Sequence, residues 1–190
     1  MADLDPLWAV LREGQRVGAI GPLAVDEAVE HSIRFVDALA DEATRVIDIG
    51  SGGGLPGLVI GWCRRDLRVT LVDRRSSRTD FLRRAVQRLG LEQGTAVITA
   101  DVRELAQRSA HAKAYDAVTA RSFGPPDLTV RMALPLLKMG GEILISDPPG
   151  PPRWPTVLAG DLGEQVVVIR TGVGLTVLGQ PGVFGVSRET

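Results

Sequence analysis

A run of glycines with acidic side chains beside it is the part of this sequence whose residue types could bind a ligand. The run is Asp48-Ile49-Gly50-Ser51-Gly52-Gly53-Gly54-Leu55-Pro56-Gly57, and it directly follows the apolar segment 45–47. Because glycine lacks a side chain, the backbone there can turn sharply and approach a ligand closely. Asp73 and Asp101 each follow a later apolar segment. Together, the glycines and the acids indicate a nucleotide-like ligand.

Two ligand classes fit the glycine run. Gly52-x-Gly54-x-x-Gly57 matches the dinucleotide fingerprint, in which a pyrophosphate lies on a helix N-terminus. Asp48 stands just before the glycines, where its charge would repel a diphosphate and attract a cationic amino group. S-adenosylmethionine has such an amino group and no phosphate, so we favour it as the ligand. The dinucleotide stays open as an alternative.

Asp73 and Asp101 fit the adenosine half of either ligand. A carboxylate at position 73 can accept hydrogen bonds from both ribose hydroxyls, and one at position 101 can accept from an adenine amino group. Carboxylates after strands also commonly cap the next helix, which is the competing structural interpretation of each acid.

Short apolar segments alternate with amphipathic ones, which predicts an α/β fold. The segments rich in β-branched residues read as strands buried on both faces, and therefore as a parallel sheet covered by helices. We expect the five strands at 45–49, 68–72, 96–99, 115–119 and 141–145. Two final strands are predicted at 165–170 and 183–188, joined by a glycine-rich link with an extended loop. The expected strand order is 3-2-1-4-5-7-6, with the last strand antiparallel.

Helical spacing of apolar residues predicts the elements that cover this sheet. A helix is expected at 25–40 and another at 77–89, where Ser77-Arg78-Thr79-Asp80 resembles a capping box. A short helix near 4–11 is also indicated, and the proline-rich segment 147–152 requires a loop. We expect one methyltransferase-like domain over 1–190, with a helical segment at 1–44, a cofactor-binding core at 45–147, and a loop and strands at 148–190.

Composition narrows the class of protein. With 44% hydrophobic and 24% charged residues in 190, the chain has the composition of a globular domain. One cysteine and two histidines are too few for a zinc site, so no metal is expected. The acidic start resembles no signal peptide, and no apolar run reaches the roughly 20 residues that span a bilayer. We therefore expect a soluble, cytoplasmic protein without a membrane partner.

The glycine run, ending in Leu55-Pro56-Gly57, resembles the loop of the RsmG (GidB) family. Further matching segments are Thr70-Leu71-Val72-Asp73, Arg78-Thr79-Asp80-Phe81-Leu82-Arg83 and Thr119-Ala120-Arg121-Ser122-Phe123. The resemblance implies a seven-stranded class I methyltransferase sheet, S-adenosylmethionine as cofactor and guanine N7 of small-subunit ribosomal RNA as methyl acceptor. With the residue patterns above, it gives these expected cofactor-binding residues: Asp48, Gly50, Ser51, Gly52, Gly54, Leu55, Asp73, Arg74, Asp101, Val102, Arg103 and Arg121.

The resemblance also places His31 at the family's histidine before the first strand, as a substrate-binding candidate. A half-buried helix histidine is the alternative interpretation of His31. The chain departs from the family after the fifth strand, where the usual basic residue is replaced by Ser146-Asp147. It also has Asp101 where the family often has arginine.

A local excess of arginine suggests how RNA would bind. Residues 64–88 hold nine arginines against three acids. Arg83, Arg84 and Arg88 on the polar face of the predicted helix 77–89 are our candidates for phosphate contacts. A solvated helix face with an Asp80–Arg84 pair is the alternative. For the whole chain, a small-molecule or protein methyltransferase and a non-catalytic cofactor-binding module remain competing functions.

Overall fold

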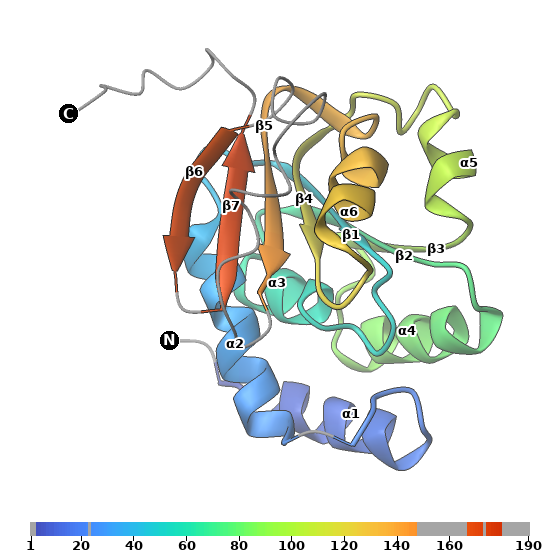
Figure 1. Cartoon of the computed structure of the whole chain (residues 1–190). Helices are drawn as coiled ribbons and strands as arrows, with labels where there is room; N and C mark the ends of the chain where they lie inside the picture. The colour runs from blue at the N-terminus through green and yellow to red at the C-terminus, as the bar shows by residue number, and fades with distance from the viewer. Residues whose placement is uncertain (1–2, 23, 148–166, 173, 180–190) are drawn as a thin grey trace.

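A seven-stranded sheet runs through the centre of the protein, in the order β3-β2-β1-β4-β5-β7-β6. The computed structural model describes residues 3–22, 24–147, 167–172 and 174–179 (Figure 1). The strands β1 to β5 are parallel neighbours, and β7 is antiparallel to both β5 and β6. Their bounds are β1 Arg45–Ile49, β2 Arg68–Asp73, β3 Thr95–Thr99, β4 Tyr115–Ala120, β5 Leu137–Ser146, β6 Val167–Gly172 and β7 Leu175–Gly179.

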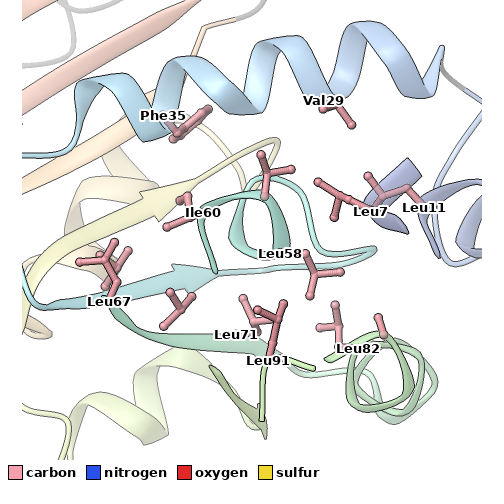
Figure 2. Close-up of a cluster of buried hydrophobic side chains, with 14 of the residues drawn as sticks. Leu7, Leu11, Val29, Phe35, Leu58, Ile60, Leu67, Leu71, Leu82 and Leu91 are labelled. Carbon is pink, nitrogen blue, oxygen red and sulfur yellow. The ribbon is translucent and has the colours of Figure 1, made fainter. Parts of the chain in front are cut away.

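Helices cover both faces of the sheet because its central strands are apolar on both. Neighbouring residues of one strand enter different cores: Val46 packs into one hydrophobic cluster and Ile47 into the other. The first cluster lies under α1 to α4, and Figure 2 shows Phe35, Leu58 and Leu82 converging in it. The second lies under α5 and α6. The helices are α1 Asp5–Arg16, α2 Val25–Ala38, α3 Gly57–Cys63, α4 Ser76–Arg88, α5 Val102–Ala106 and α6 Pro126–Ala133.

The predicted fold class, strand order and antiparallel last strand are confirmed. The helices expected at 25–40 and 77–89 are present as α2 and α4, and the short helix near 4–11 extends to Arg16. No helix in the described part of the chain is both long and apolar enough to cross a membrane.

The predicted capping box at the start of α4 is wrong. The helix begins at Ser76 with Arg75 as its N-cap, and no side chain caps it. Thr79 Oγ1 instead donates to the Ser76 carbonyl oxygen at 3.0 Å and lies 2.6 Å from Thr99 Oγ1. Thr79 therefore ties the helix to the end of β3.

The extended loop predicted between the last two strands is also wrong, because β7 occupies part of that segment. Its residues Leu175, Val177 and Leu178 are buried, and a tight turn at Gly174, with φ of +75°, connects it to β6. Flanking glycines made this segment look like a link, although β7 pairs with a strand on each side. The strand predicted at 183–188 and nearly all of the proline-rich loop lie outside the described residues.

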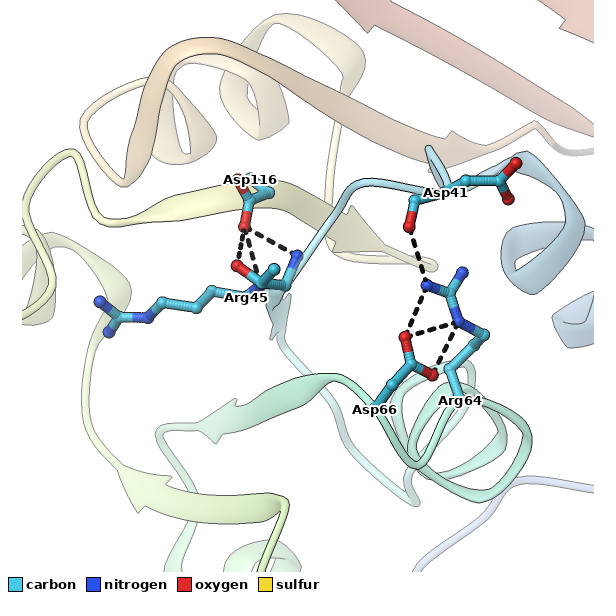
Figure 3. A network of polar contacts seen from close by, with 6 residues as sticks. Asp41, Arg45, Arg64, Asp66 and Asp116 are labelled. Atoms are coloured by element: carbon cyan, nitrogen blue, oxygen red, sulfur yellow. Dashed lines mark hydrogen bonds and ion pairs between the residues drawn. The ribbon is translucent and has the colours of Figure 1, made fainter.

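Asp116 fastens the amino ends of β1, β4 and β5 to one another. Its carboxylate accepts hydrogen bonds from the Thr44 and Arg45 N–H groups at 3.0 and 2.8 Å and from the Thr44 hydroxyl at 2.9 Å, and it pairs with Lys138. Figure 3 shows Asp116 beside Arg45 and a second cluster, in which Arg64 pairs with Asp66. Both clusters lie at the end of the sheet where its central parallel strands begin.

The ionisation of Asp116 should make the stability of the protein depend on pH. Burial raises its pKa, but the hydrogen bonds from Lys138, Thr44 and Arg45 outweigh burial and lower the pKa from 3.8 to about 2. This carboxylate therefore stabilises the fold above pH 4, by about 1 to 2 kcal/mol, and the contribution is lost as the pH falls towards 2. In urea unfolding, Asp116→Asn should lack this loss of free energy of unfolding between pH 4 and 2. A loss as large as that of the wild type would contradict the assignment.

Candidate cofactor-binding site

A cavity of about 710 Å³ opens at the carboxyl ends of β1, β2 and β4. This end of a parallel sheet, where the chain order reverses beside β1, is where open α/β folds bind ligands. The sequence-predicted residues that line the cavity are Gly50, Ser51, Gly52, Leu55, Asp73, Arg74, Asp101, Val102, Arg103 and Arg121. Asp48 and Gly54 are the two predicted cofactor residues that do not line it.

Ser51 holds the glycine loop against β2. Its N–H donates to the Val72 carbonyl oxygen at 2.9 Å, and its hydroxyl oxygen accepts the Val72 N–H at 3.0 Å. The same hydroxyl donates to the Asp48 carbonyl oxygen at 2.7 Å. Gly50 and Gly52 on either side have φ of +68° and +54°, a region that favours glycine. The loop is therefore fixed in a conformation that exposes its backbone to the cavity.

Phe123 closes the loop from the β4 side. A Cβ atom added to Gly50 would lie 2.6 Å from Phe123 Cδ2, so the aromatic ring and the loop backbone are in direct contact. Phe123, Leu128 and Met132 form an apolar wall of the cavity. Phe123 belongs to one of the matching sequence segments, but no sequence pattern predicts its contact with Gly50.

Asp73 is the carboxylate best placed to meet a ligand. Its Oδ2 accepts the Gly52 N–H at 3.0 Å and its Oδ1 accepts the Arg75 N–H at 2.9 Å. Each carboxylate oxygen has a second lone pair, so both remain able to accept hydroxyl groups from the cavity. The two backbone bonds fix the orientation of the carboxylate.

Asp101 has a structural role as well as a place in the cavity wall. It is the N-cap of α5 and accepts the Arg103 N–H at 2.9 Å, as the capping interpretation expected. The Arg103 guanidinium pairs with the same carboxylate at 2.8 Å and lowers its pKa to about 2. Asp101 is therefore ionised, and its charge is largely compensated by Arg103.

Asp48 lies beneath the glycine loop, fully buried. Its Oδ1 accepts the Thr119 hydroxyl at 2.9 Å, while Oδ2 has no hydrogen-bond partner among the described residues. Burial raises its pKa to about 6, against the hydrogen bond from Thr119 and the charge of Arg121. A Cβ atom added to Gly57 would lie 2.7 Å from Oδ2, so the acid stands at the start of α3.

Arg121 reaches the cavity from the end of β4. Its Nη1 donates to the Ala28 carbonyl oxygen in α2 at 3.3 Å. Burial lowers its pKa, and the nearby charge of Asp48 opposes that effect. Arg121 thus brings a half-buried positive charge beside the glycine loop.

The four substrate candidates do not line this cavity. His31 is half-buried in α2, with Nε2 2.9 Å from the Gly174 carbonyl oxygen and its ring 5.7 Å from that of Phe35. Burial lowers its pKa, so it is a neutral packing histidine at neutral pH. Arg83 pairs with Asp80 at 2.9 Å and donates to Thr99 Oγ1 at 2.9 Å, while Arg84 and Arg88 are exposed on α4.

Sequence patterns missed the wall that comes from the amino-terminal segment. Three residues between α1 and α2 line the cavity: Ala19, Ile20 and Gly21. A Cβ atom added to Gly53 would lie 2.2 Å from Ile20 Cγ1, so this segment packs directly on the glycine loop. Missed cavity residues also include Arg75 and Arg78. Within the described ranges, no group of three or more His, Cys, Asp or Glu residues could hold a metal ion.

The sheet order, the glycine loop after β1 and the acid at the end of β2 define the class I methyltransferase fold. A methyltransferase from Geobacter sulfurreducens shares it with a TM-score of 0.67 and 13% identity, over 95% of this chain and 90% of that one. The [4+2]-cyclase SpnF also shares it, with a TM-score of 0.58 and 20% identity, over 80% of this chain and 62% of that one. Because one neighbour is a cyclase, the fold alone does not define the reaction.

Residues 9–146 match the GidB family model, described as rRNA small subunit methyltransferase G, and the chain belongs to this family. A ribosomal RNA small subunit methyltransferase G from Rubrobacter xylanophilus is 36% identical over 140 residues, which are 72% of this chain and 52% of the relative. One from Salinispora arenicola is 37% identical over 187 residues, 95% of this chain and 74% of the relative. This chain spans 52 to 60% of the length of relatives from Rubrobacter, Mycolicibacterium, Salinispora tropica and Acidothermus.

Asp48 should make the protein less stable at neutral pH than at pH 4. Its folded-state pKa of about 6 lies above its ordinary value of 3.8, so the contribution of Asp48 to stability is greatest below pH 4 and is lost as the pH rises through 6. The loss should be about 2 to 3 kcal/mol. Urea unfolding at pH 4 and 7 measures this difference in free energy of unfolding. Asp48→Asn should abolish the difference, and the exposed control Asp41→Asn should keep it. A difference that persists in Asp48→Asn would show that another group causes it.

Proposed function

We propose that this protein transfers a methyl group from S-adenosylmethionine to guanine N7 of small-subunit ribosomal RNA. The observation that carries the proposal is the family match over residues 9–146, which include every residue of the cavity wall. The named activity of the relatives supports RNA as the acceptor.

The polar groups and the shape of the cavity fit S-adenosylmethionine. Asp73 would accept the ribose hydroxyls, since its carboxylate is already oriented by two backbone N–H groups. Asp101, Val102 and Arg103 would border the adenine. A Cβ atom added to Gly52 would meet only the Gly50 carbonyl oxygen, at 3.7 Å, so the loop leaves room there for the methionine portion.

The position of Asp48 favours this cofactor over a dinucleotide. A dinucleotide would bring its pyrophosphate to the N-terminus of α3, where Asp48 Oδ2 already lies close to Gly57. With a pKa of about 6, this buried carboxylate is mostly ionised at neutral pH and would repel the phosphates. The same charge would favour the cationic amino group of methionine, acting through the loop.

When bound, the cofactor supplies a methyl group activated by the positive sulfur. Guanine N7 has a free lone pair, so the protein needs no general base to remove a proton. The task of the protein is to align the base with the methyl group, and alignment alone can supply about 7 to 11 kcal/mol in favourable cases. Phe123, Leu128 and Met132 would shield this region from water, and Arg121 would orient the acceptor.

A small-molecule acceptor is the second candidate, and Asp147 is the observation that favours it. This acid stands where the family usually has a basic residue. Its carboxylate accepts the Thr176 hydroxyl, and its N–H donates to the Gly174 carbonyl oxygen at 2.9 Å. Asp147 therefore joins β5 to β7 and offers no positive charge to an RNA phosphate.

Binding of S-adenosylmethionine should depend on Asp73 and Gly52. Asp73→Ala should weaken binding by about 1.5 to 3 kcal/mol, because charged hydrogen bonds to the ribose are lost. Gly52→Arg should abolish binding, because the new side chain would fill the space of the ligand. Isothermal titration calorimetry with S-adenosylmethionine and with NAD checks both. Binding of NAD without binding of S-adenosylmethionine or its demethylated product would contradict the cofactor assignment.

Binding of RNA should depend on the polar face of α4. Replacing Arg83, Arg84 and Arg88 by alanine should flatten the salt dependence of RNA affinity by about 0.7 to 0.9 log units per lost phosphate contact. The affinity for S-adenosylmethionine should stay unchanged. The exposed Arg68, at the opposite end of β2, provides the control variant Arg68→Ala. Fluorescence anisotropy at several salt concentrations measures both quantities, and a wild-type slope in the triple variant would exclude α4 as an RNA contact.

A further inference from the structure

Two arginines at the start of α4 line the cavity and are not among the groups proposed above to hold the cofactor. Arg75 is the N-cap residue of α4, and Arg78 lies in its first turn. Both side chains belong to the wall that includes Asp73. They therefore bring positive charge to the part of the cavity proposed for the ribose.

The Arg78 guanidinium is only partly satisfied. Its Nη1 atom is buried and has no hydrogen-bond partner among the described residues. A buried nitrogen of a charged group without an acceptor is costly, and native proteins rarely leave one so. Arg103, which also lines the cavity, differs because it pairs with Asp101. The described part of the chain contains no ion pair for Arg75 or Arg78.

The start of α4 adds to this positive charge. The first turn of the helix contains no acidic residue, and no side chain caps its N–H groups. Free N–H groups and the helix dipole favour an anion at such an end. Asp73 brings one negative charge to this end, because its oxygens accept the Gly52 and Arg75 N–H groups. With two arginines and the helix end against one carboxylate, this part of the cavity wall carries an excess of positive charge.

S-adenosylmethionine cannot supply this anion. Its amino group and sulfur are cationic, and its single carboxylate belongs to the methionine end, which is proposed to lie on the glycine loop. Its ribose and adenine are uncharged. An anion beside Arg75 and Arg78 must therefore come from the methyl acceptor, and RNA carries one phosphodiester per nucleotide.

We propose that Arg75, Arg78 and the N-terminus of α4 bind a phosphodiester of the acceptor RNA at the mouth of the cofactor cavity. This inference rests on the proposed function. It differs from the basic-helix contact above because Arg75 and Arg78 line the cofactor cavity, whereas Arg84 and Arg88 lie further along the helix and outside the cavity wall. The phosphate contact would set the position of the target nucleotide relative to the methyl group.

The test compares the variant Arg75→Gln/Arg78→Gln with Arg68→Gln/Arg108→Gln, which removes two exposed arginines outside the cavity wall. Small ribosomal subunits and a short RNA that the wild type methylates serve as acceptors. We expect the KM for RNA to rise at least about tenfold in the first variant only, because charged hydrogen bonds to phosphate are lost. Its affinity for S-adenosylmethionine, measured by calorimetry, should stay within about twofold of wild type.

Neutral methylphosphonate linkages identify the contact itself. Replacing each phosphodiester of the short RNA in turn should reveal one linkage whose neutralisation weakens binding to the wild type but not to Arg75→Gln/Arg78→Gln. An unchanged KM in this variant, or a loss of cofactor affinity with normal RNA binding, would overturn the phosphate site and leave the proposed function standing. A wild type that methylates no RNA would contradict the proposed function and the phosphate site together.

Discussion

The candidate site depends on how the glycine loop is attached to β2. Ser51 exchanges two hydrogen bonds with Val72, and the Asp73 carboxylate accepts the Gly52 N–H. These three bonds span the carboxyl ends of β1 and β2, whose parallel register brings Ile49 opposite Val72. The loop, the acid and the cavity therefore exist only where these two strands are correctly paired. The Asp116 cluster, at the other end of β1 and β4, ties β1 to its second neighbour, β4.

The loop conformation also requires a buried acid and a close aromatic contact. Asp48 is buried with one carboxylate oxygen unpartnered, and Phe123 lies against Gly50. The buried acid would not be selected for stability alone, since a buried carboxylate without an ion pair destabilises the folded state. Asp48 lies under the loop and Phe123 lies over it, where the charge of one and the shape of the other can contribute to ligand binding.

Much of the core could be predicted from the sequence because local pattern and tertiary burial agree there. The central strands are apolar on both faces, and α4 buries Phe81, Leu82 and Ala85 from one helical stripe. Prediction failed where the tertiary context decides the structure. The glycines flanking Leu175 to Leu178 suggested a loop, but pairing with β5 and β6 makes that segment a strand.

The cavity shows the same limit. The residues of the glycine loop and the strand ends were predictable because their order along the chain follows a known binding pattern. The wall formed by residues 19–21 and the position of the Phe123 ring were not predictable, because a local sequence pattern does not reveal contacts between distant segments. The substrate role that the family position suggests for His31 stays a prediction: its Nε2 bonds to the Gly174 carbonyl oxygen, and the side chain does not line the cavity.

The most direct test of the proposed function is methyl transfer from labelled S-adenosylmethionine, offered with small ribosomal subunits, with naked small-subunit ribosomal RNA and with a small-molecule fraction. Mass analysis of nuclease fragments locates the label. The account predicts a single labelled guanine, methylated at N7, in the RNA. A protein that binds S-adenosylmethionine but labels no RNA, or that labels only small molecules, would contradict it.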